Sequence, residues 1–453
     1  MSEELEELRE TLGSALITDA TALEATRADK SGHRSAGLPL ALVEARTIEH
    51  VQAALRWASA HGIPVVPRGA GTGLAGGANA GPGELVISTE RMTRILEISV
   101  DDELAVVEAG ILNGDLNAAL EPHGLWFAPD PASRAISTIG GNLATNAGGL
   151  MCVKYGVTRE AVLGLTVVLA DGRVLRLGHR TVKGVTGYDL TALFIGSEGT
   201  LGIIVEATLA LRRRVPGEVA TVSAAFPDVE AAARASAAIS RSGIRPAALE
   251  LLDAASLEAI GELLELDLGG RGAQLLIRTD GPGSRAEADA VLEIVRAHGG
   301  EAELAADAAE GERLFEMRRA FHPAMERRGT VLIEDVAVPR SALPAMFAAI
   351  TRIEREHGIR IPTVAHAGDG NLHPNFVFEP EGDGEVPERV WAAADEMFQE
   401  CLRLGGTLTG EHGVGLLKRR WLAQELGDDT VELQRQVKAV FDPAGILNPG
   451  KIF

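Results

Sequence analysis

In the first half of the chain, apolar positions alternate between helical and strand spacing. Residues 47–61 place Val51, Leu55 and Ala58 on one helical face before Gly62, and residues 63–66 are typical of a strand. Asp171-Gly172 predicts a hairpin turn between two apolar strands. The other predicted elements are a helix at 113–121, stopped at Gly124, and strands at 84–88, 104–108, 163–170, 174–177 and 200–211. This part of the chain is therefore predicted to be α+β.

The second half begins where Arg212–Arg214, Pro216 and Gly217 interrupt the apolar pattern. A capping box, Ser284-x-x-Glu287, is predicted to open a helix that stops at Gly299. Further helices are predicted at 228–241, 309–327, 343–357 and 387–404, and strands at 273–279, 331–338 and on both sides of residues 367–372. This pattern predicts an antiparallel sheet covered by helices, as in a ferredoxin-like substrate domain.

Three glycine-rich segments lie in the first half: residues 67–77, 137–149 and 194–204. The first has a formal G-x-G-x-x-G pattern, but Ala78 to Gly83 contains Pro82 and small residues that cannot begin the helix a Rossmann site requires. Successive backbone N–H groups of such loops can still cradle a pyrophosphate. Three loops indicate one large ligand with several anchor points, although a single glycine run can also be an ordinary tight turn.

A histidine-rich segment carries the clearest chemistry. V-A-H-A-G-D-G-N-L-H-P-N holds His366 and His373 on either side of a turn, so a hairpin would bring the two rings together. Glu411 and His412 follow in T-G-E-H-G-V-G, where Gly410 and Gly413 can bend the backbone so that both side chains share one pocket. Two imidazoles and a carboxylate suit a divalent ion such as zinc with an open coordination position, and leave one base. Individually, such histidines can also be hydrogen-bonded packing residues.

Composition narrows the classes of function. The chain has 453 residues, which predicts two or three domains, and a net charge of −21 with 4% aromatic residues, which disfavours nucleic acid and anionic membranes. Cys152 and Cys401 form no paired-ligand motif, which favours a reducing compartment without disulfides or an iron–sulfur cluster. The acidic N-terminus lacks a signal-peptide pattern and no transmembrane segment is predicted, so we expect a cytoplasmic protein.

The combination of these motifs resembles the FAD-linked 2-hydroxy-acid dehydrogenases of the vanillyl-alcohol-oxidase superfamily. This group includes D-lactate dehydrogenase, the glycolate oxidase flavin subunit and D-2-hydroxyglutarate dehydrogenase. The motifs are P-R-G-A-G-T-G-L-A-G-G, I-G-G-N-L-A-T-N-A-G-G, G-Y-D-L-T-A-L-F-I-G-S-E-G-T-L-G-I-I, H-A-G-D-G-N-L-H-P-N, G-E-H-G-V-G and F-D-P-A-G-I-L-N-P-G-K. The resemblance implies an N-terminal helical segment at 1–36, a two-lobed FAD-binding domain of the PCMH type at 37–214, a substrate and metal domain at 215–440, and a tail at 441–453 that returns to the FAD domain.

By the same resemblance, FAD is held without a covalent bond, because Thr72 stands near the position where bicovalent members carry histidine. The residues implied around FAD are Pro67, Arg68, Gly69, Ala70, Gly71, Thr72, Gly73, Gly76, Gly77, Ser137, Thr138, Gly140, Gly141, Asn142, Asn146, Gly148, Glu198, Gly199, Ile203, Ile204 and Asn448. The implied metal ligands are His366, His373 and Glu411. The implied substrate-binding residues are Arg318, Asn375, His322 and His412, and His412 is also the implied catalytic base.

The implied reaction is the oxidation of a D-2-hydroxy acid to the 2-oxo acid. The ion would bind the hydroxyl and a carboxylate oxygen, His412 would take the hydroxyl proton, and hydride would leave for flavin N5. In the 2-hydroxyglutarate enzymes a lysine precedes the equivalent of Glu334-Asp335, whereas this chain has Ile333. This difference favours D-lactate or glycolate and keeps D-2-hydroxyglutarate as the alternative.

Three other interpretations make different predictions. A metal-dependent hydrolase would use the same ion and base but would have no role for the glycine loops. An NAD-dependent dehydrogenase needs a helix after Gly76, and a flavin-binding accessory subunit would have an incomplete metal set. The sequence leaves open whether the electron acceptor is a quinone, an electron-transfer flavoprotein, an iron–sulfur subunit or oxygen. It also leaves open whether the protein is a homodimer.

Overall fold

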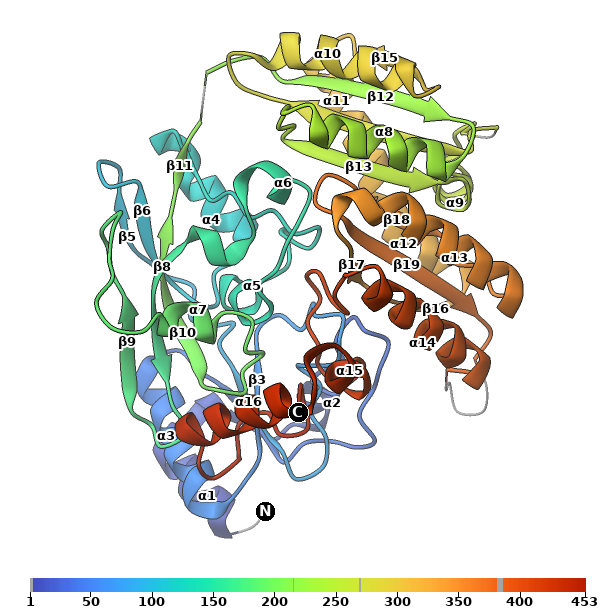
Figure 1. Cartoon of the computed structure of the whole chain (residues 1–453). Coiled ribbons are helices and arrows are strands. Elements are labelled where there is room, and N and C mark those ends of the chain that lie inside the picture. Colours follow the sequence, from blue (N-terminus) through green and yellow to red (C-terminus); the bar gives the residue numbers. More distant parts are fainter. Residues whose placement is uncertain (1–2, 215, 269, 381–385) are drawn as a thin grey trace. The chain divides into compact units, whose positions relative to one another are not determined.

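A computed structural model of the chain describes residues 3–214, 216–268, 270–380 and 386–453. The chain forms two compact units (Figure 1). The first consists of Met1–Gly148, Gly156–Arg214 and Glu411–Phe453, and the second of Gly149–Tyr155 and Val215–Gly410. One division falls after Arg214, at the predicted boundary, whereas residues 411–440 group with the first unit and residues 149–155 with the second.

The first unit contains two main sheets. In the four-stranded sheet, with order β1-β2-β4-β3, strands β2, β4 and β3 are parallel, and the five-stranded sheet has the antiparallel order β5-β6-β10-β8-β9. Its strands are β1 (Leu16–Ile17), β2 (Ala41–Glu44), β3 (Val65–Arg68), β4 (Leu85–Ser88), β5 (Ile95–Ser99), β6 (Leu104–Glu108), β7 (Leu125–Trp126), β8 (Val162–Val168), β9 (Val174–Gly178), β10 (Ile203–Ala210) and β11 (Arg212–Arg213). Its helices are α1 (Glu3–Leu12), α2 (Ala20–Glu24), α3 (Ile48–His61), α4 (Asn113–Leu120), α5 (Ile139–Thr145), α7 (Leu190–Phe194), α15 (Leu422–Leu426) and α16 (Asp428–Phe441).

Local sequence explains most of these elements. Helix α3 begins after Thr47, whose hydroxyl accepts the N–H of His50, and ends at Gly62 in the left-handed conformation, as the pattern predicts. The first glycine segment is followed by β4 and not by a helix, so the Rossmann interpretation is excluded. The second glycine segment is not wholly a loop: Thr138 caps the short helix α5, because its hydroxyl accepts the N–H of Gly141.

The second unit is built on one antiparallel sheet with strand order β15-β12-β14-β13-β18-β19-β16, and β17 also pairs with β19 (Figure 1). It is wider than the four strands of a ferredoxin-like β-α-β-β-α-β unit. Its strands are β12 (Ala220–Phe226), β13 (Ala248–Asp253), β14 (Ala273–Thr279), β15 (Glu301–Leu304), β16 (Thr330–Ile333), β17 (Val336–Ala337), β18 (Thr363–His366) and β19 (Asn371–Phe378). Its helices are α6 (Cys152–Tyr155), α8 (Val229–Arg241), α9 (Ala254–Leu264), α10 (Ser284–Ala297), α11 (Ala308–Arg319), α12 (Phe321–Arg328), α13 (Leu343–His357) and α14 (Glu388–Arg403).

One face of this sheet packs against α9, α11 and α12. Their buried residues, including Ile260, Phe315 and Met325, form one apolar cluster with Leu252 of β13 and Val364 of β18. Helix α8 contacts the same central strands β13 and β14, and it also packs against α13, which contacts α14 (Figure 1). The sheet is thus covered by helices, as the sequence predicts.

Three local predictions in this unit are wrong. Gly283, not Ser284, is the N-cap of α10, and no side-chain capping bond forms there. The helix predicted at 309–327 is two helices, because Pro323 lacks the N–H that a continuous helix needs. The strand predicted at 331–338 is divided into β16 and β17, opposite Pro374 of β19, which cannot donate to the ladder.

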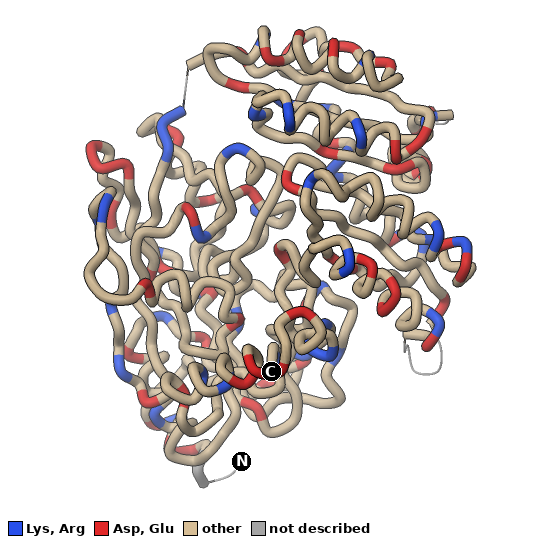
Figure 2. Tube along the Cα trace, in the orientation of Figure 1, with Lys and Arg blue, Asp and Glu red and all other residues tan. Residues whose placement is uncertain are grey.

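Charged side chains of both signs are interspersed along the chain (Figure 2). On α13, for example, Arg352 contacts Glu356 of the same helix and Glu396 and Glu400 of α14. In the part of the chain that the structure describes, no helix is long and apolar enough to cross a membrane.

The C-terminal tail packs into the first unit. Leu447 forms a parallel bridge with Val65 of β3, and the N–H of Asn448 donates to the Val65 carbonyl. Asp442, at the end of α16, fixes the turn before the tail: its carboxylate accepts the N–H groups of Ile446 and Leu447 and pairs with Lys438 at 2.6 Å. The predicted return of the tail is therefore supported by one buried carboxylate in addition to its pairing with β3.

We expect Asp442→Ala to destabilise the protein by about 3 kcal/mol, because it leaves the largely buried Lys438 without its counter-charge and two N–H groups without their acceptor. Thermal unfolding followed by circular dichroism measures the loss. The matched control is Glu432→Ala on the exposed face of α16, which should change stability by less than about 0.5 kcal/mol. Equal stability of the two variants would contradict this role of Asp442.

Candidate active site

The two histidines of the predicted hairpin lie on adjacent strands of the second unit. His366 ends β18 and His373 lies in β19, with Val364 directly opposite His373 in the register. Because residues at alternate positions of a strand share a face, His366, Val364 and His373 project from the same side of the sheet. The ring centroids are 5.0 Å apart and the rings are nearly perpendicular, at 82°. Both side chains are buried, so the prediction that the hairpin brings the rings together is confirmed.

A buried carboxylate supports His366 from the neighbouring strand. Glu250 of β13 lies opposite His366 in the register, and its Oε1 is 2.8 Å from His366 Nδ1. The other oxygen, Oε2, is 2.9 Å from Nη2 of Arg318 on α11. Burial would raise the pKa of Glu250, but the interactions with His366 and Arg318 outweigh burial and hold this pKa below its usual value. Arg318, a predicted substrate-binding residue, is therefore joined to His366 through a single acid.

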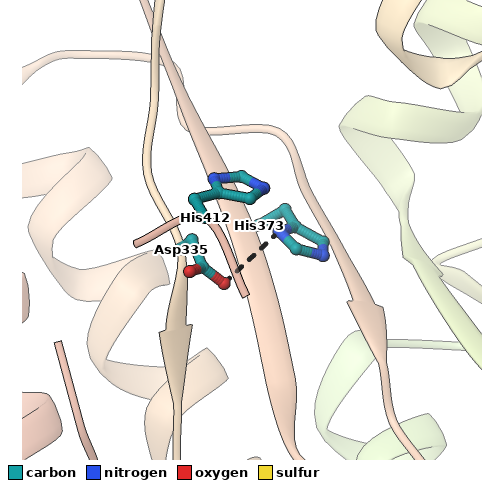
Figure 3. Close-up of side chains that lie close together, drawn as sticks. All are labelled: Asp335, His373 and His412. Atoms are coloured by element: carbon teal, nitrogen blue, oxygen red, sulfur yellow. Dashed lines mark ion pairs between the residues drawn. The ribbon is translucent and has the colours of Figure 1, made fainter. Parts of the chain in front are cut away.

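A second buried carboxylate, Asp335, lies behind His373. Figure 3 shows its carboxylate facing the His373 ring, and Asp335 Oδ1 is 3.8 Å from His373 Nδ1. Asp335 also accepts the Asn371 amide at 2.6 Å. Its Oδ2 accepts the Thr409 hydroxyl at 2.6 Å and the Gly410 N–H at 2.9 Å. Asp335 thus fixes the backbone immediately before Glu411 and His412.

The remaining predicted substrate residues of this unit differ in their surroundings. Asn375 lies in β19, two residues after His373, and its amide donates to the His373 carbonyl at 2.9 Å. Its Oδ1 is buried and has no hydrogen-bond partner among the described residues. His322 lies on α12 with its side chain 44% exposed, and its Nε2 is 3.5 Å from Glu326. His322 is thus on a more exposed surface than Asn375.

Glu411 and His412 begin the third segment of the first unit. Gly410, just before them, must be glycine because a Cβ there would overlap the Asn371 amide, and Gly413, just after them, has a φ of +87°. Glu411 packs against Gly148, where a Cβ would lie 3.3 Å from the Glu411 Cβ. The left-handed backbone at Gly413 fits the predicted bend, and close packing against Asn371 explains the glycine at 410.

Glu198 holds the chain on the far side of His412. Its Oε1 accepts the N–H of Val414 at 2.7 Å, and its Oε2 accepts that of Gly415 at 2.8 Å. Burial raises the pKa of this carboxyl to about 7, although the two N–H groups oppose the shift. Within the first unit, the side chain predicted to lie near FAD therefore clamps the segment that carries His412.

The other residues predicted around FAD all belong to the first unit. Pro67 and Arg68 end β3, and Arg68 donates to the carbonyls of Ala78, Ala25 and Ala28, so its side chain fixes the loop. Asn448 joins two of the glycine segments, because its amide donates to the carbonyls of Gly77 and Glu198. The rest lie in the loop at 69–77, in and around α5 at 137–148, and at 199–204.

Sequence comparison identifies the class and then the family. Residues 39–178 match the family described as "FAD binding domain", and residues 215–452 match "FAD linked oxidases, C-terminal domain". The chain therefore belongs to the FAD-linked oxidase family. The solved structure of p-cresol methylhydroxylase has the same fold, with a TM-score of 0.82 and 18% identity over 99% of this chain and 96% of that one. This match confirms the predicted PCMH-type fold.

Three curated relatives cover most of the chain. Glycolate oxidase subunit GlcD of Bacillus subtilis is 42% identical over 92% of this chain and 89% of the relative. D-Lactate dehydrogenase of Anaerostipes hadrus is 36% identical over 91% and 89%, and D-2-hydroxyglutarate dehydrogenase of Stutzerimonas stutzeri is 35% identical over 97% and 96%. These matches confirm that the protein is a FAD-linked oxidoreductase.

We expect Glu198 to make stability depend on pH. The pKa of the Glu198 carboxyl is about 7 in the folded protein and 4.5 ordinarily. The contribution of this group to folding stability is therefore fully present below pH 4.5 and is lost as the pH rises through 7. This difference between the two pKa values corresponds to roughly 3 kcal/mol of folding stability. In urea unfolding at pH 5 and pH 8, the wild type should lose more stability than Glu198→Gln by about this amount. Parallel pH profiles for the two proteins would contradict the assignment.

Proposed function

We propose that the protein oxidises a short D-2-hydroxy acid, D-lactate or glycolate, to the 2-oxo acid with noncovalently bound FAD and a divalent metal ion. The observation that carries this proposal is the buried pair His366 and His373, backed by Glu250, in a chain that belongs to the FAD-linked oxidases. The named relatives act on glycolate, D-lactate and D-2-hydroxyglutarate, which supports the class of substrate.

The first unit fits a bound FAD. Asn448 is buried with a φ of +43°, and its Oδ1 has no partner among the described residues, although its amide is bound by two glycine-rich segments. A buried acceptor without a donor is a place where a bound ligand can supply one. FAD would accept the hydride from the substrate carbon. The protein's contribution is then to hold the substrate and remove its hydroxyl proton.

The donor set also fits a divalent ion. Since Nδ1 of His366 bonds to Glu250, Nε2 is the nitrogen that would bind the metal, as in the carboxylate–histidine pairs of metal sites. Imidazole ligands suit zinc and its neighbours. We propose Glu411 as the third ligand, because it follows Gly410 by one peptide step of about 3.8 Å and Asp335 fixes Gly410. The ion would lower the pKa of the substrate hydroxyl.

Three side chains are proposed to act on the substrate. His412 takes the hydroxyl proton as a neutral base, and its backbone lies between the segments held by Asp335 and Glu198. Arg318 binds the substrate carboxylate; its Nε is buried without a partner among the described residues. Asn375 likewise has a buried Oδ1 without a hydrogen-bond partner among the described residues. Arg318 and Asn375 thus each have a buried polar atom that a substrate could bond to, in the unit that carries His366 and His373.

The pairing register of β16 with β19 supports a 2-hydroxy acid without a second carboxylate. Ile333 of β16 lies directly opposite Asn375 of β19, so the two side chains project from the same face with Cβ atoms about 5 Å apart. A second carboxylate reaching past Asn375 would meet an apolar side chain and lose solvation without gaining a partner. This position favours D-lactate or glycolate over D-2-hydroxyglutarate, which remains the alternative.

We propose a cytoplasmic location, because the two cysteines of the sequence, Cys152 and Cys401, lie in no paired motif, which favours a reducing compartment. The electron acceptor is proposed to be a quinone, an electron-transfer flavoprotein or an iron–sulfur subunit. An acceptor in the membrane would bring the protein to the membrane surface without a spanning helix.

The direct test is anaerobic reduction of the purified, flavin-loaded protein. D-Lactate or glycolate should bleach the visible flavin absorption, and L-lactate should not. His412→Ala should keep its flavin spectrum but reduce at least about 100-fold more slowly, because the base is lost. His298→Ala, on the exposed end of α10, is the matched control and should reduce at the wild-type rate. A colourless protein that hydrolyses esters or amides would contradict the proposal.

Ile333→Lys tests the substrate assignment. A cation beside Asn375 should raise kcat/KM for D-2-hydroxyglutarate relative to D-lactate by about tenfold or more, because a charge-assisted bond contributes roughly 1.5–3 kcal/mol. Ile333→Leu keeps the volume and polarity and should leave the ratio unchanged. If the wild type already prefers D-2-hydroxyglutarate, the choice of a short substrate is wrong while the class of reaction stands.

A further inference from the structure

Glu250 is a fully buried acid whose two oxygens have different partners. Oε1 is 2.8 Å from His366 Nδ1 and Oε2 is 2.9 Å from Arg318 Nη2. The exposed fraction of its side chain is 0%, and that of the Arg318 side chain is 9%. Glu250 comes from β13, His366 from β18 and Arg318 from α11, so one carboxylate joins three elements of the second unit.

The surroundings make these contacts obligatory. Glu250 lies between Leu249 and Leu251, both buried, in a strand that is buried along most of its length. A carboxylate in such a place is stable only when its charge and lone pairs are matched. Because the match comes from a hydrogen bond with one imidazole and an ion pair with one guanidinium, neither partner can turn away without leaving the acid uncompensated.

The contact with His366 has a chemical consequence. A carboxylate accepts hydrogen bonds, so Nδ1 of His366 carries a proton and Nε2 of the neutral ring does not. The contact with Arg318 uses Nη2 and leaves Nε without a partner among the described residues. The same acid therefore selects the ring nitrogen that would bind a metal and leaves Nε of Arg318 for an anionic ligand.

We propose that Glu250 is a positioning residue that aligns the metal ligand His366 and the carboxylate-binding Arg318 with one another. This inference rests on the proposed function, in which an ion and Arg318 hold the same 2-hydroxy acid. Glu250 touches neither substrate nor flavin in this account and acts only through its two partners. A purely structural ion pair would stabilise the unit without controlling either the tautomer of His366 or the affinity for metal.

The first experiment determines the tautomer of His366 in the wild-type protein. Long-range ¹H–¹⁵N correlation spectra of histidine-labelled, flavin-loaded, metal-free protein at pH 8 should show Nδ1 protonated and Nε2 unprotonated, with His366→Asn used for the assignment. In Glu250→Gln, we expect the two tautomers to become mixed. A wild-type ring protonated at Nε2 overturns the inference, even if the variant cannot be produced.

The second experiment measures zinc affinity by competition with a chelator, with flavin absorbance as the check on folding. Glu250→Gln should bind zinc roughly 10- to 100-fold more weakly than the wild type. It should also bind pyruvate, the 2-oxo product of D-lactate, more weakly, because Arg318 loses its fixed orientation. Glu312→Gln is the matched control: Glu312 pairs with Arg278 and Arg319 and should match the wild type in both measurements.

The outcomes separate the inference from the function on which it rests. If the wild type binds no divalent ion, the metal part of the proposed function fails. If the wild type binds zinc and Glu250→Gln binds it equally well with an unchanged tautomer, the inference fails while the proposed function stands. Loss of zinc affinity in Glu312→Gln as well would show a general effect of removing acids near α11, and would also overturn the positioning role.

Discussion

The arrangement of functional side chains in the second unit depends on burying the Glu250 charge. An unpaired carboxylate in a sheet interior costs several kcal/mol, so its partners must stay in place for the unit to be stable. Those partners are His366 and Arg318, which come from a different strand and from a helix. Because this buried charge must be matched, the orientations of His366 and Arg318 are fixed. Both residues have proposed roles in binding. Packing alone would not select one ring nitrogen or one guanidinium edge.

Two further buried carboxylates also hold neighbouring segments in place. Asp335 holds Thr409 and Gly410, and Glu198 holds Val414 and Gly415. Glu411 and His412 follow Gly410 and precede Val414 in the chain. Each acid acts within its own unit. Glu411 and His412 are the proposed third ligand and the proposed base.

Patterns of spacing predicted much of this structure. The hairpin around 367–370, the helices α3, α8 and α13, and the absence of a helix after Gly76 all follow from local sequence. The errors are local too: Pro323 and Pro374 divide a helix and a strand that the apolar pattern presents as continuous. The eight-stranded width of the sheet depends on pairing between distant segments, which spacing does not encode.

Only part of the candidate site could be predicted from the sequence. The histidines, Glu411 and His412 were recognisable from residue type and glycine flanks, but Glu250 and the role of Asp335 were missed. A signal was present for Glu250, a single acid in the apolar run A-A-L-E-L-L, because such a residue in a buried strand must have a partner. Its partners, His366 and Arg318, are 116 and 68 residues away in sequence and could be identified only from the register of β13 with β18 and the packing of α11.

The most direct measurement is anomalous X-ray scattering at the zinc edge from crystals of the flavin-loaded protein grown with zinc. The account predicts one strong peak about 2.1 Å from Nε2 of both His366 and His373, with Nδ1 of His366 still bonded to Glu250. A peak bound through Nδ1 of His366 with Glu250 displaced, or no peak at the two histidines, would contradict it.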